Sequence, residues 1–275
     1  MQPSHREARG SGAARGLTLA GRPLEPPYLY PTGWRARQYF TARDDPDRTR
    51  EPWRAPDFAL EAPVAQRGRR ARAEELPLPP GRGLCGRSSF ARVVHGVLDG
   101  EQCRVLLAAV NAKGFTPALL NVGGGNQMLL PGSRDGQRAI VDSPELAAWL
   151  LGVLVPHLPA RVGAWELVDL NERLRFLCYV PGQEFPAHVD GQYVRPAGHP
   201  DAGAVSKVTV QLYLHSLPEA HGGATTFFPG SGSAVAFQPT AGSALLFTQD
   251  LEHEGSLLRE GLKYTVRTEA MYRRR

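Results

Sequence analysis

The sequence predicts a mainly β protein: a double-stranded β-helix, or jelly roll, with two or three flanking α-helices, preceded by a disordered N-terminal segment. After residue 163, short apolar segments alternate with turns rich in Gly, Pro and Asp at intervals of roughly ten residues, a spacing typical of all-β sandwiches and barrels. Two amphipathic helical patterns precede these segments. Residues 1–83 show neither the period of a strand nor that of a helix.

Residues 1–83 form an Arg- and Pro-rich leader, and residues 84–275 form the predicted domain, with its jelly-roll core at about 170–275. The leader holds twelve of the 24 prolines, and too few apolar residues repeat in it to offset the entropy of ordering the backbone. Residues 1–82 carry fifteen of the 32 basic and ten of the 27 acidic residues. The domain therefore has no net charge, which argues against nucleic acid as a specific partner.

Two helices are expected before the strands. Asp99 and Gln102 have the spacing of a capping box, and Gly114 ends the first helix. Its apolar stripe consists of Cys103, Leu106, Leu107 and Val110. Ser143 as N-cap and Pro144 at the first helical position begin the second helix. The apolar face of this second helix consists of Leu146, Leu150, Val153 and Leu154.

Eight strands are predicted after the helices, because each segment is a run of apolar residues bounded by turn residues. They lie at 174–180, 184–190, 206–215, 222–228, 233–239, 243–249, 253–258 and 262–272. Residues 88–98 fit a strand or a short helix, and the glycines at 123–125 are interpreted as a turn, because no phosphate-binding motif surrounds them. The loop 191–205 is long, and long ordered loops beside a site are usually functional.

His188 and Asp190 stand two residues apart in the second of these segments, so their side chains are expected on the same face of a strand. A histidine and a carboxylate on one face can hold adjacent positions around an octahedral metal. A second histidine completes the facial triad of non-haem Fe(II) sites. His253 supplies that group later in the chain, and the three residues are the predicted metal ligands.

Four motifs extend this pattern. The first, YxPGxxFxxHxD, consists of Tyr179, Pro181, Gly182, Phe185, His188 and Asp190. GGATTFFP at 222–229, ALLF before His253 and GxKYT at 261–265 follow in order. Across about residues 90–275 the chain thereby resembles the Fe(II)- and 2-oxoglutarate-dependent dioxygenases, specifically the prolyl 4-hydroxylase alpha-subunit-like catalytic domain. The resemblance implies the same three iron ligands and Lys263 as the residue that anchors the far carboxylate of 2-oxoglutarate.

The chemistry of the last strand supports this anchor. A carboxylate buried without a partner is costly, so the far end of the pocket needs a cation. Lys263, Thr265 and Arg267 share one strand face, and a cation followed by a hydroxyl suits a carboxylate. Arg267 is the fallback anchor, and its other expected roles are pairing with Glu269 or contact with the substrate. Tyr179 and Tyr213 are candidates for a further hydroxyl on the same carboxylate.

The resemblance implies an oxygenase that takes Fe(II), 2-oxoglutarate and O2 and hydroxylates a C–H bond of a prolyl (peptidyl or free) or similar amino-acid substrate. It also implies ascorbate as the reductant that restores the iron. The protein contributes geometry, a dry cavity and a substrate loop, for which residues 191–205 with Tyr193 and Arg195 are the candidate. No catalytic side chain is expected beyond the metal centre.

Two alternatives draw on the same residues. An AlkB-like nucleic-acid demethylase of the same superfamily shares the spacing from Tyr179 to Asp190 and an arginine pair, Arg267 and Arg273. The neutral domain and the position of Lys263 favour the hydroxylase instead. A non-catalytic jelly roll would bind a peptide in its groove, but an intact triad with a cation anchor argues against such a module.

The expected partners are a peptide, protein or small-molecule substrate, with no specific nucleic acid and no membrane. No segment reaches the roughly 20 apolar residues of a membrane span, and the first residues lack the apolar stretch of a secretory signal. Three cysteines, odd in number and far apart in sequence, indicate a reducing compartment. We therefore expect a cytoplasmic or nuclear protein that is not secreted, with organelle targeting by the Arg-rich N-terminus as the alternative.

Overall fold

A computed structural model describes residues 71–78, 89–118, 136–230 and 233–275, together with the backbone of five short strands. These strands are β1 (Thr18–Leu19), β2 (Arg22–Pro23), β3 (Tyr39–Phe40), β7 (Leu120–Gly123) and β8 (Asn126–Met128). β1 pairs with β2, and β8 pairs with both β3 and β7. The turn predicted at 123–125 falls between β7 and β8, and its residues 124–125 lie outside the described part of the chain.

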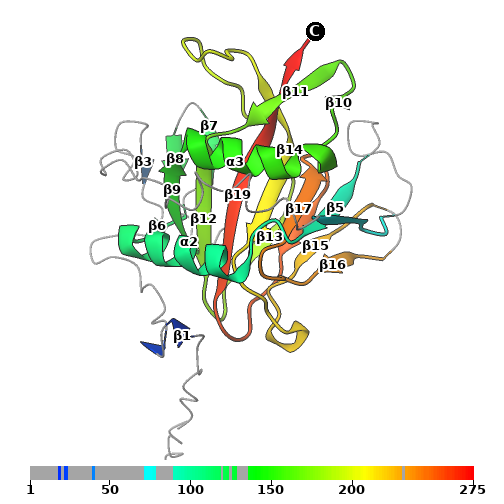
Figure 1. Ribbon diagram of the computed structural model, residues 1–275. Helices are drawn as coiled ribbons and strands as arrows, with labels where there is room; N and C mark the ends of the chain where they lie inside the picture. The colour runs from blue at the N-terminus through cyan, green and yellow to red at the C-terminus, as the bar shows by residue number, and fades with distance from the viewer. Residues whose placement is uncertain are drawn as a thin grey trace, which may run out of the picture.

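A ten-stranded antiparallel sheet forms the larger layer (Figure 1). Its main path runs β4 (Arg72–Glu75), β5 (Ala91–His95), β17 (Ala244–Thr248), β14 (Val205–Tyr213), β19 (Lys263–Arg274), β12 (Arg173–Tyr179), β9 (Gln137–Asp142) and β6 (Thr116–Pro117). β11 (Trp165–Leu170) pairs with the far half of β19 and with β10 (Arg161–Val162). The long strand β19 therefore connects most of the layer.

A four-stranded antiparallel sheet forms the second layer. Its order is β13 (Phe185–His188), β18 (His253–Gly255), β15 (Thr225–Phe227) and β16 (Val235–Phe237), and the 3-10 turn η2 (Glu219–His221) precedes β15. Apolar side chains join the two layers, because Phe227 of the small sheet packs in one buried cluster with Tyr213 and Phe247 of the large sheet. The predicted jelly roll is confirmed, and all eight predicted strands are present.

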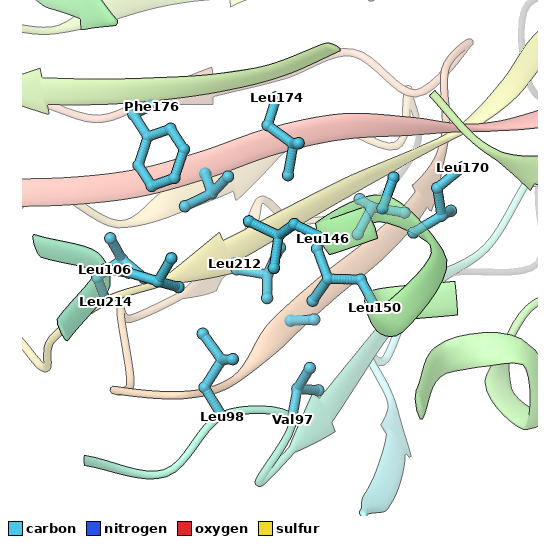
Figure 2. Packing of buried hydrophobic residues seen from close by; sticks show 14 of the residues in the cluster. Val97, Leu98, Leu106, Leu146, Leu150, Leu170, Leu174, Phe176, Leu212 and Leu214 are labelled. Carbon is cyan, nitrogen blue, oxygen red and sulfur yellow. The ribbon is translucent and has the colours of Figure 1, made fainter. Parts of the chain in front are cut away.

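Two helices cover one face of the large sheet: α2 (Gly100–Lys113) and α3 (Pro144–Leu154), which continues into the 3-10 turn η1 (Val155–His157) (Figure 1). The predicted caps are confirmed. Asp99 and Gln102 form both bonds of a capping box, and the Ser143 hydroxyl accepts a hydrogen bond from the Leu146 amide. Apolar residues of the helices and the sheet interdigitate in the largest core cluster, as Figure 2 shows for Leu106, Leu146, Leu150, Leu174, Phe176 and Leu212.

The two faces of β19 serve different layers. Tyr264, Val266, Ala270 and Tyr272 belong to the core cluster beneath the helices. The alternate residues Lys263, Thr265 and Arg267 face the small sheet and line a pocket between the layers. Because side chains along a strand alternate between its faces, one strand supplies both the apolar core and the polar floor of the site.

Part of the predicted leader belongs to the large sheet. Residues 72–75 form β4, which pairs with β5 at the edge of the large sheet. Leu76 and Leu78, just beyond it, pack against the cluster that joins the two layers. This burial orders a segment whose charged strand carries no apolar period of its own.

Residues 91–95 form a strand, which settles the choice between strand and short helix that the sequence left open for 88–98. Among the described helices, none is long and apolar enough to cross a membrane.

Candidate metal centre and adjoining pocket

Three side chains converge between the two sheets. His188 Nε2 lies 3.7 Å from Asp190 Oδ1, and His253 Nε2 lies 3.9 Å from Asp190 Oδ2. The three ligand atoms all lie within 4.8 Å of one another. The described residues contain no other group of three metal-ligating side chains. Two imidazoles and one carboxylate on one side of a cavity form the donor set of a facial triad.

Backbone carbonyls orient both imidazoles. His188 Nδ1 lies 2.8 Å from the Pro186 carbonyl oxygen, and His253 Nδ1 lies 2.9 Å from the Leu251 carbonyl oxygen. A hydrogen bond donated by Nδ1 leaves the lone pair on Nε2, the atom that faces Asp190. Burial lowers the pKa of His253 to about 4, so this ring is neutral at neutral pH, the form that binds a metal. The residues thus fit a divalent metal.

Local chain geometry places the first two ligands. β13 ends at His188, and Asp190 lies just beyond it, so the expectation that both residues belong to one strand is wrong. The Asp190 amide donates a hydrogen bond to the Gln249 carbonyl, which fixes the backbone that carries the carboxylate. β13 pairs with β18 so that His188 stands opposite His253. Strand pairing therefore joins ligands that are 65 positions apart in the chain.

The Asp190 carboxylate is held from both sides. Arg267 Nη2 lies 2.7 Å from Oδ1, and the Thr209 hydroxyl donates to Oδ2 at 2.5 Å. Burial opposes ionisation of Asp190, but Arg267 and the hydrogen bonds outweigh it and hold the pKa of the carboxyl well below its usual range. Asp190 is therefore a carboxylate ready for a cation at any physiological pH.

A pocket leads from the three ligands to Lys263 and Thr265, both of which line it. Lys263 is buried at 4% exposure, and its ammonium donates a single hydrogen bond among the described residues, to the Ala224 carbonyl at 3.3 Å. The buried Thr265 hydroxyl has no hydrogen-bond partner in the described structure. Burial lowers the pKa of Lys263 to about 7. A buried cation beside an unsatisfied hydroxyl fits an incoming carboxylate.

The remaining predicted co-substrate residues divide into two groups. Tyr179 lines the pocket, opposite Lys263 in the strand pairing, and the Lys263 ammonium lies 5.7 Å from the centre of its ring. Tyr213 does not line the pocket. It is fully buried, and its hydroxyl shares a hydrogen bond with Thr225 at 2.8 Å. Through this bond Tyr213 orients a residue of the pocket wall, and its contact with the carboxylate stays a prediction.

Arg267 lines the pocket, but its guanidinium already pairs with the metal ligand Asp190 and lies 3.8 Å from Glu269. Glu269 also binds Arg175 at 2.8 Å. These contacts place Arg267 at the metal end of the pocket, in a row of alternating charges. Lys263 is the cation at the other end. The geometry therefore favours Lys263 as the anchor over the fallback, Arg267.

The predicted substrate loop is anchored by an ion-pair cluster. The Arg195 side chain is 1% exposed, and its guanidinium binds Asp169 at 2.8 Å and Glu172 at 2.9 Å. Arg195 does not line the pocket, and in the described structure its guanidinium fixes the loop to the acidic residues at 169 and 172; its contact with substrate stays a prediction. The Tyr193 amide is held by the Ser206 hydroxyl, and its ring does not line the pocket either.

Several pocket residues were not predicted as functional. Phe185 stacks on His188 with ring centres 3.8 Å apart. A bulge between these residues brings them to one side although they are three apart. Gln211 and Thr225 also line the pocket, and the Gln211 amide donates to Thr225 at 3.1 Å. The position of Phe185 in the YxPGxxFxxHxD motif was a signal, whereas nothing in the sequence marked Gln211.

The other histidines that the structure describes near this region lie outside the metal cluster. His199 lies 3.7 Å from Glu172, and His221 lies 3.5 Å from Glu260. His215 contacts the Leu262 carbonyl. Asp250, three residues before His253, accepts a hydrogen bond from the Ser89 hydroxyl at 3.2 Å. The triad is thus completed by His253 alone.

Comparison with known proteins agrees with this donor set. Residues 174–268 match the family model of the 2OG-Fe(II) oxygenase superfamily. This matched segment contains the three converging ligands, Lys263 and Thr265. A comparison with curated proteins finds no match.

Solved structures of three proteins are similar to this chain. A viral collagen prolyl hydroxylase from Paramecium Bursaria Chlorella virus-1, in complex with 2OG, shares 19% identity over 66% of this chain and 95% of its own, with a TM-score of 0.47. A Pseudomonas putida prolyl-4-hydroxylase shares 20% identity over 67% of this chain and 92% of its own, also with a TM-score of 0.47. A Trichoplax adhaerens prolyl hydroxylase, in complex with a hypoxia inducible factor peptide, shares 16% identity over 82% of this chain and 94% of its own, with a TM-score of 0.49.

Proposed function

We propose that this protein is an Fe(II)- and 2-oxoglutarate-dependent oxygenase, in keeping with the match of residues 174–268 to the 2OG-Fe(II) oxygenase superfamily. One observation carries the proposal. A single pocket has a two-histidine, one-carboxylate donor set at one end and a buried lysine with an unpartnered threonine hydroxyl at the other. These ends match the two functions of a 2-oxo dicarboxylate, which chelates a metal and presents a second carboxylate.

The side chains of the pocket have separate tasks. His188, Asp190 and His253 would hold the metal, and Lys263 with Thr265 would bind the distal carboxylate, so that the co-substrate lies in one orientation. When bound, the iron and 2-oxoglutarate supply the oxidative decarboxylation and the hydroxylation. Leu177 and Phe185 contribute apolar walls. Such walls exclude water and strengthen the electrostatic contacts within the pocket.

We further propose a prolyl (peptidyl or free) or similar amino-acid substrate. The support is the motif from Tyr179 to Asp190 together with Lys263, which resembles the prolyl 4-hydroxylase alpha-subunit-like branch. Ascorbate as reductant and a cytoplasmic or nuclear location belong to the same proposal. The peptide-binding and demethylase alternatives are distinguished by the assay below.

Succinate release provides the test. The full chain is incubated with Fe(II), 2-oxoglutarate and O2, with and without ascorbate, and with a library of proline-containing peptides, free amino acids and a methylated oligonucleotide. We expect Fe(II)-dependent succinate and a peptide or amino-acid product that is one oxygen atom heavier. His188→Ala should abolish turnover, because the facial triad loses a ligand. His157→Ala, which replaces a histidine of η1 that does not line the pocket, is the matched control and should retain turnover.

Three results would contradict the proposal. Binding of 2-oxoglutarate without any succinate would indicate the non-catalytic module. Demethylation of the oligonucleotide, with no product among peptides and amino acids, would indicate the demethylase. Equal turnover in His188→Ala and wild type would show that the metal site lies elsewhere.

A further inference from the structure

Gly255 occupies a wall position between the metal ligands and the lysine. It is the last residue of β18 and stands two after His253, so a side chain at 255 would point to the same face as the metal ligand. Its cross-strand partners are Phe185 of β13 and Thr225 of β15. Both partners line the pocket, and so does Gly255 itself.

The space beside Gly255 lies next to the Lys263 ammonium. A Cβ atom added at residue 255 would lie 3.8 Å from Lys263 Nζ and 3.5 Å from the Phe185 Cβ. These are ordinary van der Waals distances, so the fold itself leaves room for a methyl group. The missing side chain therefore creates empty volume at the end of the pocket where the distal carboxylate would bind.

The backbone does not explain the glycine. Gly222 adopts a φ of +70°, and a Cβ atom there would overlap the Leu257 carbonyl oxygen, so that position requires glycine. The φ of Gly255 lies outside the left-handed region, and no backbone atom comes closer than 3.8 Å to its added Cβ. The conformation and the packing both permit alanine, so the absence of a side chain matters for the pocket.

We infer that Gly255 sets the length and width of the 2-oxo dicarboxylate that the pocket accepts, an inference that rests on the proposed function. A carboxylate oxygen must approach Lys263 Nζ to about 2.7–2.9 Å. One side of this ammonium already faces the Ala224 carbonyl. A methyl group at residue 255 would occupy another side and push the carboxylate back toward the metal. A four-carbon acid stops short of that methyl group, whereas five-carbon 2-oxoglutarate does not.

The test compares two acids and two alanine variants of the full chain. Mn(II)-loaded protein is titrated calorimetrically with 2-oxoglutarate and with oxaloacetate, so the readout is binding and not turnover. Gly255→Ala should weaken 2-oxoglutarate binding about tenfold or more, as overpacking of a filled site does. Oxaloacetate binding should change less, which shifts the ratio of the two affinities toward the shorter acid. Gly152→Ala, in α3 with open space around its Cβ, should leave both affinities unchanged.

A second arm uses only the wild-type protein. 2-Oxoglutarate with a methyl group on the carbon next to its distal carboxylate should bind about tenfold or more weakly than the parent acid, because the carboxylate itself already fills the volume beside Gly255. Binding of this methylated acid by wild type within a few-fold of 2-oxoglutarate, or equal losses for 2-oxoglutarate and oxaloacetate in Gly255→Ala, would overturn the inference. Failure of wild type to bind any of these acids would instead refute the proposed function.

Discussion

Replacing Lys263 with Met tests the assignment of the co-substrate anchor. The change removes the buried ammonium and keeps an apolar stem of similar length. A 2-oxoglutarate carboxylate would then enter the pocket without its cation. Truncating one partner of a buried charge pair costs about 2–5 kcal/mol, so affinity should fall roughly 30-fold to several thousand-fold.

The same change should stabilise the protein in the absence of co-substrate. Burial lowers the pKa of Lys263 from 10.5 to about 7, so keeping this lysine charged destabilises the folded state. The folded pKa is below the unfolded one. The cost is therefore fully present below pH 7 and disappears as the pH rises from about 7 to 10.5. At about 1.36 kcal/mol per pKa unit, this destabilisation of the folded state amounts to some 3–5 kcal/mol at neutral pH.

Calorimetric titration of Mn(II)-loaded protein with 2-oxoglutarate measures the loss of affinity in Lys263→Met. Thermal unfolding without co-substrate measures its gain in stability. Arg267→Met neutralises a cation on the same face of β19 and is the matched control. It should shift 2-oxoglutarate affinity much less, because Arg267 pairs with Asp190 and not with the far end of the pocket. A larger shift in Arg267→Met than in Lys263→Met would refute the assignment and make Arg267 the anchor.

Three further predictions concern pH, the loop and the domain boundary. Wild-type affinity for 2-oxoglutarate should fall by up to tenfold per pH unit above about 7, because Lys263 loses its proton. Calorimetric titrations from pH 6 to 9 measure this affinity, and an affinity that does not change with pH would contradict the prediction. Arg195→Met should lower the free energy of unfolding in urea by about 2–3 kcal/mol, because it leaves two acidic partners without their buried cation. The loss stays moderate because these partners are partly solvated, and an unchanged free energy of unfolding would refute the anchoring role. Removing residues 1–78 should lower the thermal midpoint more than removing residues 1–70, because only the longer deletion removes β4 and the packing of Leu76 and Leu78; equal midpoints would show that this edge adds nothing.

Local signals in the sequence predicted much of the fold and the site. The caps of α2 and α3 depend on residues three apart, and strand alternation depends on residues two apart, so both are readable without the tertiary structure. Alternation along 262–272 correctly placed Lys263, Thr265 and Arg267 on one face. The spacing of His188 and Asp190, with His253 as the third donor, predicted a cluster that the structure brings within 4.8 Å.

The partners of long side chains were decided only by the tertiary structure. Arg267 could reach a carboxylate in several directions, and the pairing of β19 with β14, together with the position of Asp190, selects its contact with the metal ligand. Arg195 is drawn into the protein by Asp169 and Glu172, which precede it by more than twenty residues. A charge in a sequence has no fixed direction, because a flexible stem can turn toward solvent, substrate or an acidic neighbour.

The edge strand β4 and the open volume beside Gly255 both depend on contacts with segments far away in the sequence. Nothing within Arg72–Glu75 predicts a strand, and it forms because β5 offers a free edge and a cluster that Leu76 and Leu78 cover. A glycine in a sequence can equally indicate a turn or an empty space. At residue 255 the distinction rests on the atoms of Phe185 and Lys263 across the pocket. Local periodicity thus determined the elements and the ligand set, whereas contacts between distant segments decided which charges meet and where space remains.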